Sequence, residues 1–202
     1  MKKKEIKAFF KAVSDGNLNE VSLLVTSNKA YINLCNFAPP KKDDGQSPLQ
    51  LAFKTGNFNI ALFLIENDAD VNFMEQSTVN EWTAPVLHDC IRAAIFNSYT
   101  LQKDTGEFDK ALWLLKLMLS ESADPNAIDS YGNNCLNRAF LDSQQMIDTP
   151  AVDFTDGILL NQLRQIFKEL INAGADINLA NEKRPSVVYF IANYKMERYG
   201  LL

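Results

Sequence analysis

The sequence predicts an all-α solenoid, in which four to five helix-turn-helix repeats are joined by hairpin fingers. Three observations predict this fold class: a short phrase ending in asparagine recurs, an apolar stretch with helical spacing precedes each copy, and a helix-opening phrase follows. The asparagine phrase stands at 30–33, 69–72, 123–126 and 175–178. Because one helix pair cannot bury its own apolar face, such repeats form a core only by stacking.

The N-terminal segment is expected to cap this stack. Ile6, Phe9, Phe10 and Val13 are spaced three and four apart, which predicts a helix with one apolar face. The lysines of this segment fall on the other side, where a terminal repeat has no neighbour. No long apolar stretch follows them, so we expect no secretion signal.

Each first helix of a repeat is expected to open at a polar cap. Ser47 can accept from a free backbone N–H, Pro48 suits the first helical position, and Gln50 completes a capping box. Leu49 then points inward. The corresponding residues in the next two repeats are Thr83 with Pro85, and Asn134 with Leu136. The third repeat carries one extra residue before its proline.

Each second helix is expected to end at a left-handed residue. Ile60, Phe63 and Leu64 form the apolar stripe of the clearest second helix. The ends fall at Asn67-Asp68, at Ser122 and at Gly174, which are residue types that tolerate or favour this backbone conformation. At the C-terminus, 184–188 imitates a helix opening without a good cap, and Val188, Ile191 and Ala192 are expected to cover the last interface.

Residues 43–76 resemble an ankyrin repeat. The stretch 44–49 is similar to the family's turn and helix opening, 56–61 to its helix junction, and 68–72 to its closing phrase. The resemblance extends over nearly the whole chain and implies a single domain, residues 1–202. Its repeats are expected at 5–36, 43–76, 80–128 and 129–180, with a C-terminal cap at 181–202.

The spacing of the repeats departs from the family pattern. The closing asparagines Asn33, Asn72, Asn126 and Asn178 lie 39, 54 and 52 residues apart, whereas the family period is about 33 residues. We expect enlarged loops in the third and fourth repeats, at 97–105 and at 143–155, where Pro150 forbids a continuous helix. These loops are candidates for a second surface.

Composition and charge narrow the class of function. The chain of 202 residues is 47% hydrophobic and 22% charged, as ordinary folded proteins are. Its net charge of -5 argues against a nucleic acid partner, and no apolar run is long enough for a membrane span. Cys35, Cys90 and Cys135 lack metal or redox spacing, so we expect reduced thiols in the cytoplasm, with no metal and no cofactor.

The single histidine does not indicate an active site. His88 is followed by Asp89 and Cys90, but adjacent residues on a helix point in different directions, so the three cannot converge. His88 matches the family's histidine after the helix-opening leucine, and the resemblance implies that its ring bonds backbone groups between repeats. An enzyme remains the rival interpretation only through the carboxylates of the enlarged loops: Asp104, Glu107, Asp148, Asp153 and Asp156.

Aromatic residues divide into a predicted core set and a predicted finger set. The core set lies on helical stripes: Phe9, Phe10, Phe53, Phe58, Phe63, Phe96, Phe108, Trp113, Phe140, Phe167 and Phe190. Residues in the fingers and first helices are candidate partner contacts, although packing between fingers is an alternative. These candidates are Phe37, Lys41, Lys42, Asp44, Lys54, Thr55, Phe73, Met74, Asn80, Trp82, Tyr131 and Asn133.

The resemblance implies a non-catalytic module that binds a protein partner through its concave face and fingers. The chain is expected to be a monomer when unbound. A narrower alternative is an inhibitor or immunity-type protein that blocks a toxic enzyme. The excess of lysine over arginine and the many asparagines are similar to those of small bacterial ankyrin proteins.

Overall fold

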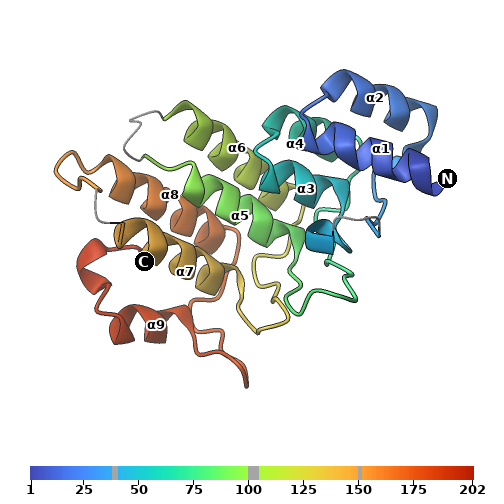
Figure 1. The fold of residues 1–202 in the computed structure, drawn as a ribbon. Helices are drawn as coiled ribbons and strands as arrows, with labels where there is room; N and C mark the ends of the chain where they lie inside the picture. Colours follow the sequence, from blue (N-terminus) through green and yellow to red (C-terminus); the bar gives the residue numbers. More distant parts are fainter. Residues whose placement is uncertain (38–40, 100–104, 150–151) are drawn as a thin grey trace.

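The computed structural model describes residues 1–37, 41–99, 105–149 and 152–202, and the regular structure within these ranges is helical (Figure 1). The inner layer contains α1 (Lys3–Ser14), α3 (Pro48–Lys54), α5 (Val86–Phe96), α7 (Cys135–Ile147) and α9 (Val187–Asn193). The outer layer contains α2 (Leu18–Ser27), α4 (Phe58–Ile65), α6 (Gly106–Ser120) and α8 (Ile158–Asn172). Short 3-10 turns occur at Lys29–Tyr31, Lys41–Asp43 and Glu197–Tyr199.

Each helix packs against its counterpart in the next repeat as well as against its own partner. Thus α3 lies between α1 and α5, and α5 between α3 and α7, while α4, α6 and α8 stack behind them. The buried side chains Phe9, Phe108, Phe140 and Phe167 belong to one continuous hydrophobic core. Since burying such a side chain stabilises the fold by about 1.5–3 kcal/mol, stacking supplies most of the stability. The predicted all-α solenoid is confirmed.

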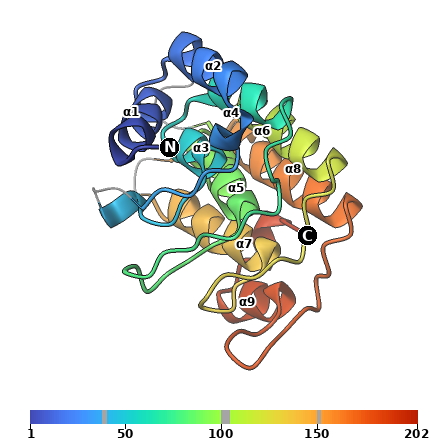
Figure 2. The same cartoon turned by 90° about the vertical axis from the view of Figure 1, so that its right-hand side faces the viewer.

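The segments that join one repeat to the next form fingers. They comprise 28–37 with 41–47, then 66–85, 121–134 and 173–186. Figures 1 and 2 show the later three projecting from the same side of the stack. Isolated antiparallel bridges, Asn36 with Gln46 and Met74 with Pro85, hold two of the fingers at their bases.

A recurring asparagine bond fastens each finger base to the next repeat. Asn72 donates from Nδ2 to the carbonyl of Ser122 at 3.0 Å, and its Oδ1 accepts from the amide of Asp124 at 2.8 Å. Asn33 makes the same pair of bonds one repeat earlier, and Asn126 one repeat later. The accepting carbonyls belong to residues with a left-handed backbone, as predicted for the helix ends: Asp68, Ser122 and Gly174. The recurring phrase in the sequence therefore marks a bond between repeats.

The helix starts follow the sequence pattern at two of the three predicted positions. Ser47 caps α3 with a complete capping box, and Asn134 caps α7 by accepting from Asn137. Thr83 does not cap α5, because the extra residue before the proline places Pro85 at the N-cap position without a side-chain bond. The backbone of Thr83 instead pairs with Ser130 of the next finger.

Several other expectations are corrected. Ser186 caps α9, so the helix is shifted, and Val187, Phe190 and Ile191 are buried while Val188 and Ala192 are exposed. Phe96 and Trp113 are 39% and 52% exposed rather than core residues, because the stripes of α5 and α6 turn outward at these positions. The other residues of the predicted core set are buried, with Phe63 half-buried.

The enlarged repeats contain longer helices as well as longer loops. The outer helices α6 and α8 each have 15 residues, compared with 8 in α4. Helix α7 continues to Ile147, so the first part of the predicted insert at 143–155 is helical. Gly106 is the first residue of α6. Pro150 and residues 100–104 lie outside the described residues.

We expect Asn72→Ala to lower the free energy of unfolding by about 1 kcal/mol, since two inter-repeat bonds are lost at a site that water reaches. Asn178→Ala is the matched control, because among the described residues its side chain has no following repeat to bond. Urea denaturation followed by circular dichroism measures both. Equal losses in the two variants would contradict the proposed role of the bond.

Gly45→Ala is expected to lower the free energy of unfolding by more than about 2 kcal/mol. Gly45 has φ +77°, and an added Cβ would lie 2.0 Å from the amide nitrogen of Ser77 in the next finger. Gly56 has φ +71° with open space around it, so Gly56→Ala should cost only about 1 kcal/mol of backbone strain. Thermal unfolding of the two variants tests this difference. Equal losses in Gly45→Ala and Gly56→Ala would mean that backbone strain alone accounts for both, without the clash between the fingers.

Candidate functional site

The inner-helix side of the stack contains two adjoining depressions of about 210 Å³ and about 590 Å³. They share Lys54 and Trp82, and together we call them the inner hollow. Its walls come from α3, α5 and the fingers at 41–47 and 66–85. The lining residues are Lys42, Gln46, Phe53, Lys54, Gly56, Glu75, Val79, Asn80, Glu81, Trp82, Asp89, Arg92, Ala93, Phe96 and Asn97.

Trp82 is fixed by contacts to two other repeat elements. Its Nε1 donates to Asp129 Oδ2 at 2.9 Å, and the Arg92 guanidinium lies 5.4 Å from its ring centroid. The same guanidinium lies 5.7 Å from the ring of Phe96. Burial acts to raise the pKa of Asp129, but bonds from Asn133 and Trp82 outweigh it and hold the pKa low. Trp82 is therefore anchored by a charged acceptor.

An ion network continues from Arg92 along the inner face. Arg92 Nε lies 3.6 Å from Asp142 Oδ2, and Arg138 donates to both oxygens of the same carboxylate, one of them from Nε at 2.9 Å. Asp142 is buried, and burial raises its pKa despite the two arginines. Both cationic groups on this part of the face are thus already paired.

Lys54 is also fully engaged. Its Nζ donates to Asp43 Oδ1 at 3.1 Å, to the Lys42 carbonyl at 3.1 Å and to Gln46 Oε1 at 3.4 Å. An ammonium group has three protons, so these three acceptors use all of them. Lys54 therefore fixes the base of the first described finger against α3.

Two buried carboxylates line the inner hollow without a directly bonded cation. Asp89 is 6% exposed, and Gln50 Nε2 donates to its Oδ2 at 3.0 Å. Glu75 is 5% exposed, and its Oε1 accepts a long bond from Asn80 at 3.5 Å. Burial raises the pKa of Asp89 to about 7 and raises the pKa of Glu75 as well.

The candidate contacts are distributed over the fingers rather than gathered at one point. Lys42, Lys54, Asn80 and Trp82 line the inner hollow. Phe37, Met74 and Tyr131 are exposed, Asp44 accepts from Ser77 Oγ, and Thr55 donates back to Leu51. The side chain of Lys41 lies outside the described residues.

Two candidate contacts are wrong in their expected exposure. Phe73 is buried, because its chain turns inward where its carbonyl accepts from Val86 at the start of α5. Asn133 is buried, and its Nδ2 donates to Asp129 Oδ2 at 2.9 Å. Both residues support the fingers instead of presenting a surface.

Sequence reasoning missed the contribution of α5 to the hollow. Asp89, Arg92 and Phe96 extend along one side of this helix toward the finger. The sequence contains a sign of this contribution: Asp89 and Arg92, three residues apart, are the two charged residues of a mainly apolar helix and therefore lie on the same face. Glu75 and Val79 were missed because finger residues follow no periodic pattern.

His88 has a structural environment. It is fully buried, and its Nε2 lies 3.2 Å from the Ala127 carbonyl of the following finger. Burial lowers its pKa to about 4, so the ring is neutral near pH 7. Gln50 and Asn137, at the same helix position, donate to the carbonyls of Ala84 and Pro185. His88 thus bonds backbone between repeats, as the family resemblance implied.

The carboxylates of the enlarged loops have local partners. Glu107 pairs with Lys110 at 2.6 Å, Asp153 accepts from Thr155, and Asp156 accepts from the Ile158 amide. Asp148 follows the end of α7, and Asp104 lies outside the described residues. Within the described ranges, no group of three or more histidine, cysteine, aspartate or glutamate residues is arranged to hold a metal ion.

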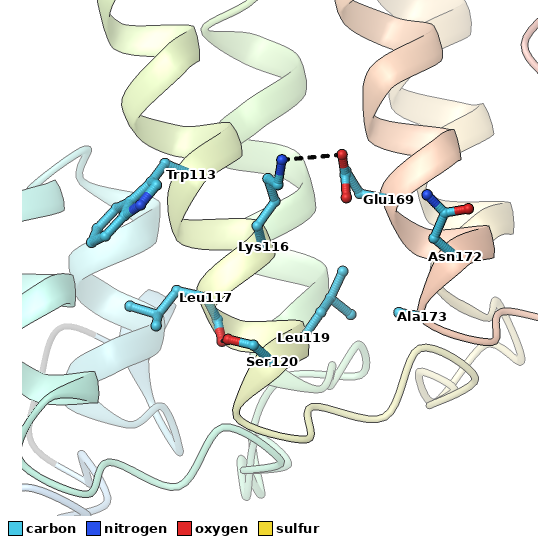
Figure 3. Close-up of a pocket in the computed structure, with 8 residues that line it drawn as sticks. All are labelled: Trp113, Lys116, Leu117, Leu119, Ser120, Glu169, Asn172 and Ala173. Atoms are coloured by element: carbon cyan, nitrogen blue, oxygen red, sulfur yellow. Dashed lines mark hydrogen bonds and ion pairs between the residues drawn. The ribbon is translucent and has the colours of Figure 1, made fainter.

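A second depression, of about 540 Å³, lies on the outer face between α6 and α8. Lys116 and Glu169 pair across it at 3.3 Å, and the half-exposed Trp113 lies on the far side of α6 (Figure 3). The predicted second surface was placed at the enlarged loops, whereas this groove lies toward the other ends of the same helices.

Comparison with known proteins agrees with the architecture. Residues 1–75 match the family model described as ankyrin repeats (3 copies). No curated protein matches the chain. None of the helices in the described parts of the chain combines the length and apolar character needed to cross a membrane.

Asp89→Asn should stabilise the protein above pH 7 and have little effect near pH 4. The folded-state pKa of Asp89 is raised from 3.8 to about 7. Below pH 4 the carboxyl group is protonated in both the folded and the unfolded chain, so its burial carries no charge penalty. As the pH rises from 4 to 7, the unfolded chain ionises first, and the folded state loses stability relative to it. The expected gain at pH 7.5 is on the order of 2–4 kcal/mol. Urea denaturation at pH 4 to 8 measures it, and a constant difference across this range would contradict it.

Proposed function

We propose that this chain, whose first 75 residues match the ankyrin-repeat family and whose helices form one stack, binds a protein partner through the inner hollow and the adjacent fingers. Ankyrin repeats generally serve as protein-interaction modules. The observation that carries the proposal is the inner hollow itself, where Trp82 is held rigidly beside Arg92 and Phe96. Rigid aromatic and arginine residues in a depression are typical of interface hot spots.

The exposed apolar side chains of the fingers extend this surface. Phe37, Met74, Val79 and Tyr131 are 56%, 41%, 50% and 44% exposed. Phe37 belongs to the first finger, Met74 and Val79 to the second, and Tyr131 to the third; the second and third fingers project from the same side of the stack (Figure 2). Aromatic residues and methionine at exposed positions favour a protein partner over a small polar ligand.

The module acts without catalysis in this proposal. His88 is buried and neutral, and burial raises the pKa values of Cys90 and Cys135 well above the ordinary thiol value, so these groups are poor nucleophiles. The three free thiols support a cytoplasmic location.

Trp82→Ala should weaken partner binding at least tenfold, since truncating a hot-spot aromatic costs about 2 kcal/mol or more. The partner is captured from a lysate of the source cells with the intact chain, and its affinity is then measured by isothermal calorimetry. Val79→Asp is a second test, because Val79 lies in the same hollow without bonding Asp129.

Trp113→Ala is the matched control, since it removes an equally large, half-exposed side chain from the outer groove. Its affinity should stay within about twofold of the parent chain. Loss of binding in Trp113→Ala, with binding unchanged in Trp82→Ala and Val79→Asp, would move the interface to the outer face and contradict the proposal.

A further inference from the structure

We propose that the inner hollow receives a cationic side chain, arginine or lysine, from the protein partner, with Glu75 as its acceptor. This rests on the proposed function and specifies the chemistry of the partner. Glu75 lines the hollow, and its Oε2 is buried without a hydrogen bond of acceptable geometry. A buried carboxylate oxygen without a donor is costly, so the site is incomplete as it stands.

The backbone around Glu75 holds the carboxylate in place. Its amide donates to the Ala84 carbonyl at 3.0 Å, directly before α5 begins. Its Oε1 accepts at 3.5 Å from Asn80, within the same finger. Hydrogen bonding from the Gln46 side chain and the Ala84 backbone also lowers its pKa, by less than burial raises it. The carboxylate of Glu75 is therefore held at the hollow by a backbone segment that is hydrogen-bonded in place.

No cation that lines the inner hollow makes a short bond to Glu75. Lys54 uses its three protons on Asp43, Gln46 and the Lys42 carbonyl. Arg92 stacks against Trp82 and pairs with Asp142. Lys54 acts on Glu75 only through its charge at a distance, which lowers the pKa of Glu75 by less than burial raises it.

The charge balance of the hollow is negative once its internal pairs are set aside. Lys54 is neutralised by Asp43, and Arg92 shares the carboxylate of Asp142 with Arg138. Asp89, Glu75 and Glu81 then face Lys42 among the lining residues. Glu75 contributes to raising the pKa of Asp89, after the larger effect of burial. An incoming cation would relieve both carboxylates.

Trp82 adds an aromatic wall to the same depression. It belongs to both parts of the hollow, and its indole already attracts one guanidinium, that of Arg92. A cation beside an aromatic ring and a desolvated carboxylate gains from both groups. The lining carboxylates Glu75, Asp89 and Glu81 also repel an acidic side chain, because among the lining cations Lys54 and Arg92 are already paired and only Lys42 opposes them.

The probe for this site is N-acetyl-arginine amide, and its neutral isostere N-acetyl-citrulline amide is the matched ligand control. Carboxyl carbon-13 shifts of Glu75 and Asp89 are followed by NMR in the full chain at pH 7.5. We expect saturable shifts with the arginine probe, and at least tenfold weaker effects with the citrulline probe.

Glu75→Gln should weaken the arginine probe at least tenfold, because an uncharged amide replaces the acceptor without changing its shape. Glu81→Gln is the matched variant, since it removes the same charge from an exposed residue of the same hollow, and should change binding less than twofold. Thermal unfolding verifies that both variants are folded, and the comparison of the two probes on the parent chain needs no variant.

Three results would overturn the inference: no saturable shift with the arginine probe, equal binding of the citrulline probe, or full affinity in Glu75→Gln. Partner capture separates this inference from the proposed function. If a captured partner depends on Trp82 but the arginine probe does not bind, then the proposed function stands and only the proposed cationic contact is wrong. Arginine binding in a chain that captures no protein removes the proposed function and leaves the anchor site standing.

Discussion

The contact between successive repeats is the constraint on which this structure depends. Each inner helix has an apolar side toward the preceding repeat and another toward the following one, so α3, α5 and α7 obtain a core only as a stack. Polar bonds set the register of that stack. Asn33, Asn72 and Asn126 bond the finger bases, while Gln50, His88 and Asn137 bond backbone above them. Apolar burial provides the energy, and the asparagine and inner-helix bonds select one geometry.

The same register produces the candidate binding surface. The fingers lie close enough that Gly45 has no room for a side chain beside Ser77, and Trp82 reaches Asp129 of the next finger. The inner hollow forms where this row meets the C-terminal halves of α3 and α5. Arg92 is paired with Asp142 of the next repeat, and Trp82 is bonded to Asp129, so the shape and potential of the hollow depend on the stack rather than on one repeat.

The periodic features of the chain were predictable, and the finger contacts were not. Helical stripes, the Ser47 and Asn134 caps and the left-handed ends at Asp68, Ser122 and Gly174 follow from local chemistry, which the sequence displays directly. Phe73 and Asn133 were misplaced because a finger residue is buried or exposed according to its neighbour in another repeat. Phe96 and Trp113 were predicted to be core residues but are exposed, because helical periodicity shows which face of a helix is apolar but not how far along that face the neighbouring helices cover it. Glu75 could not be predicted as a binding residue from the sequence, because its role rests on a buried Oε2 that only the structure shows to lack a hydrogen bond.

The bond from Trp82 to Asp129 makes the recognition surface depend on a repeat that contributes no residue to the lining of the hollow. Solenoid repeats open from their ends, each opening step requiring only the loss of one interface. Fraying from the N-terminus first removes Lys42, Gln46 and then α3, and leaves Trp82 bonded to Asp129, whereas fraying from the C-terminus releases the indole once the finger at 121–134 detaches. Truncation from the C-terminus would therefore free the Trp82 side chain, whereas truncation from the N-terminus would leave it bonded to Asp129. The C-terminal repeats thus hold the recognition surface in place without contributing to its lining.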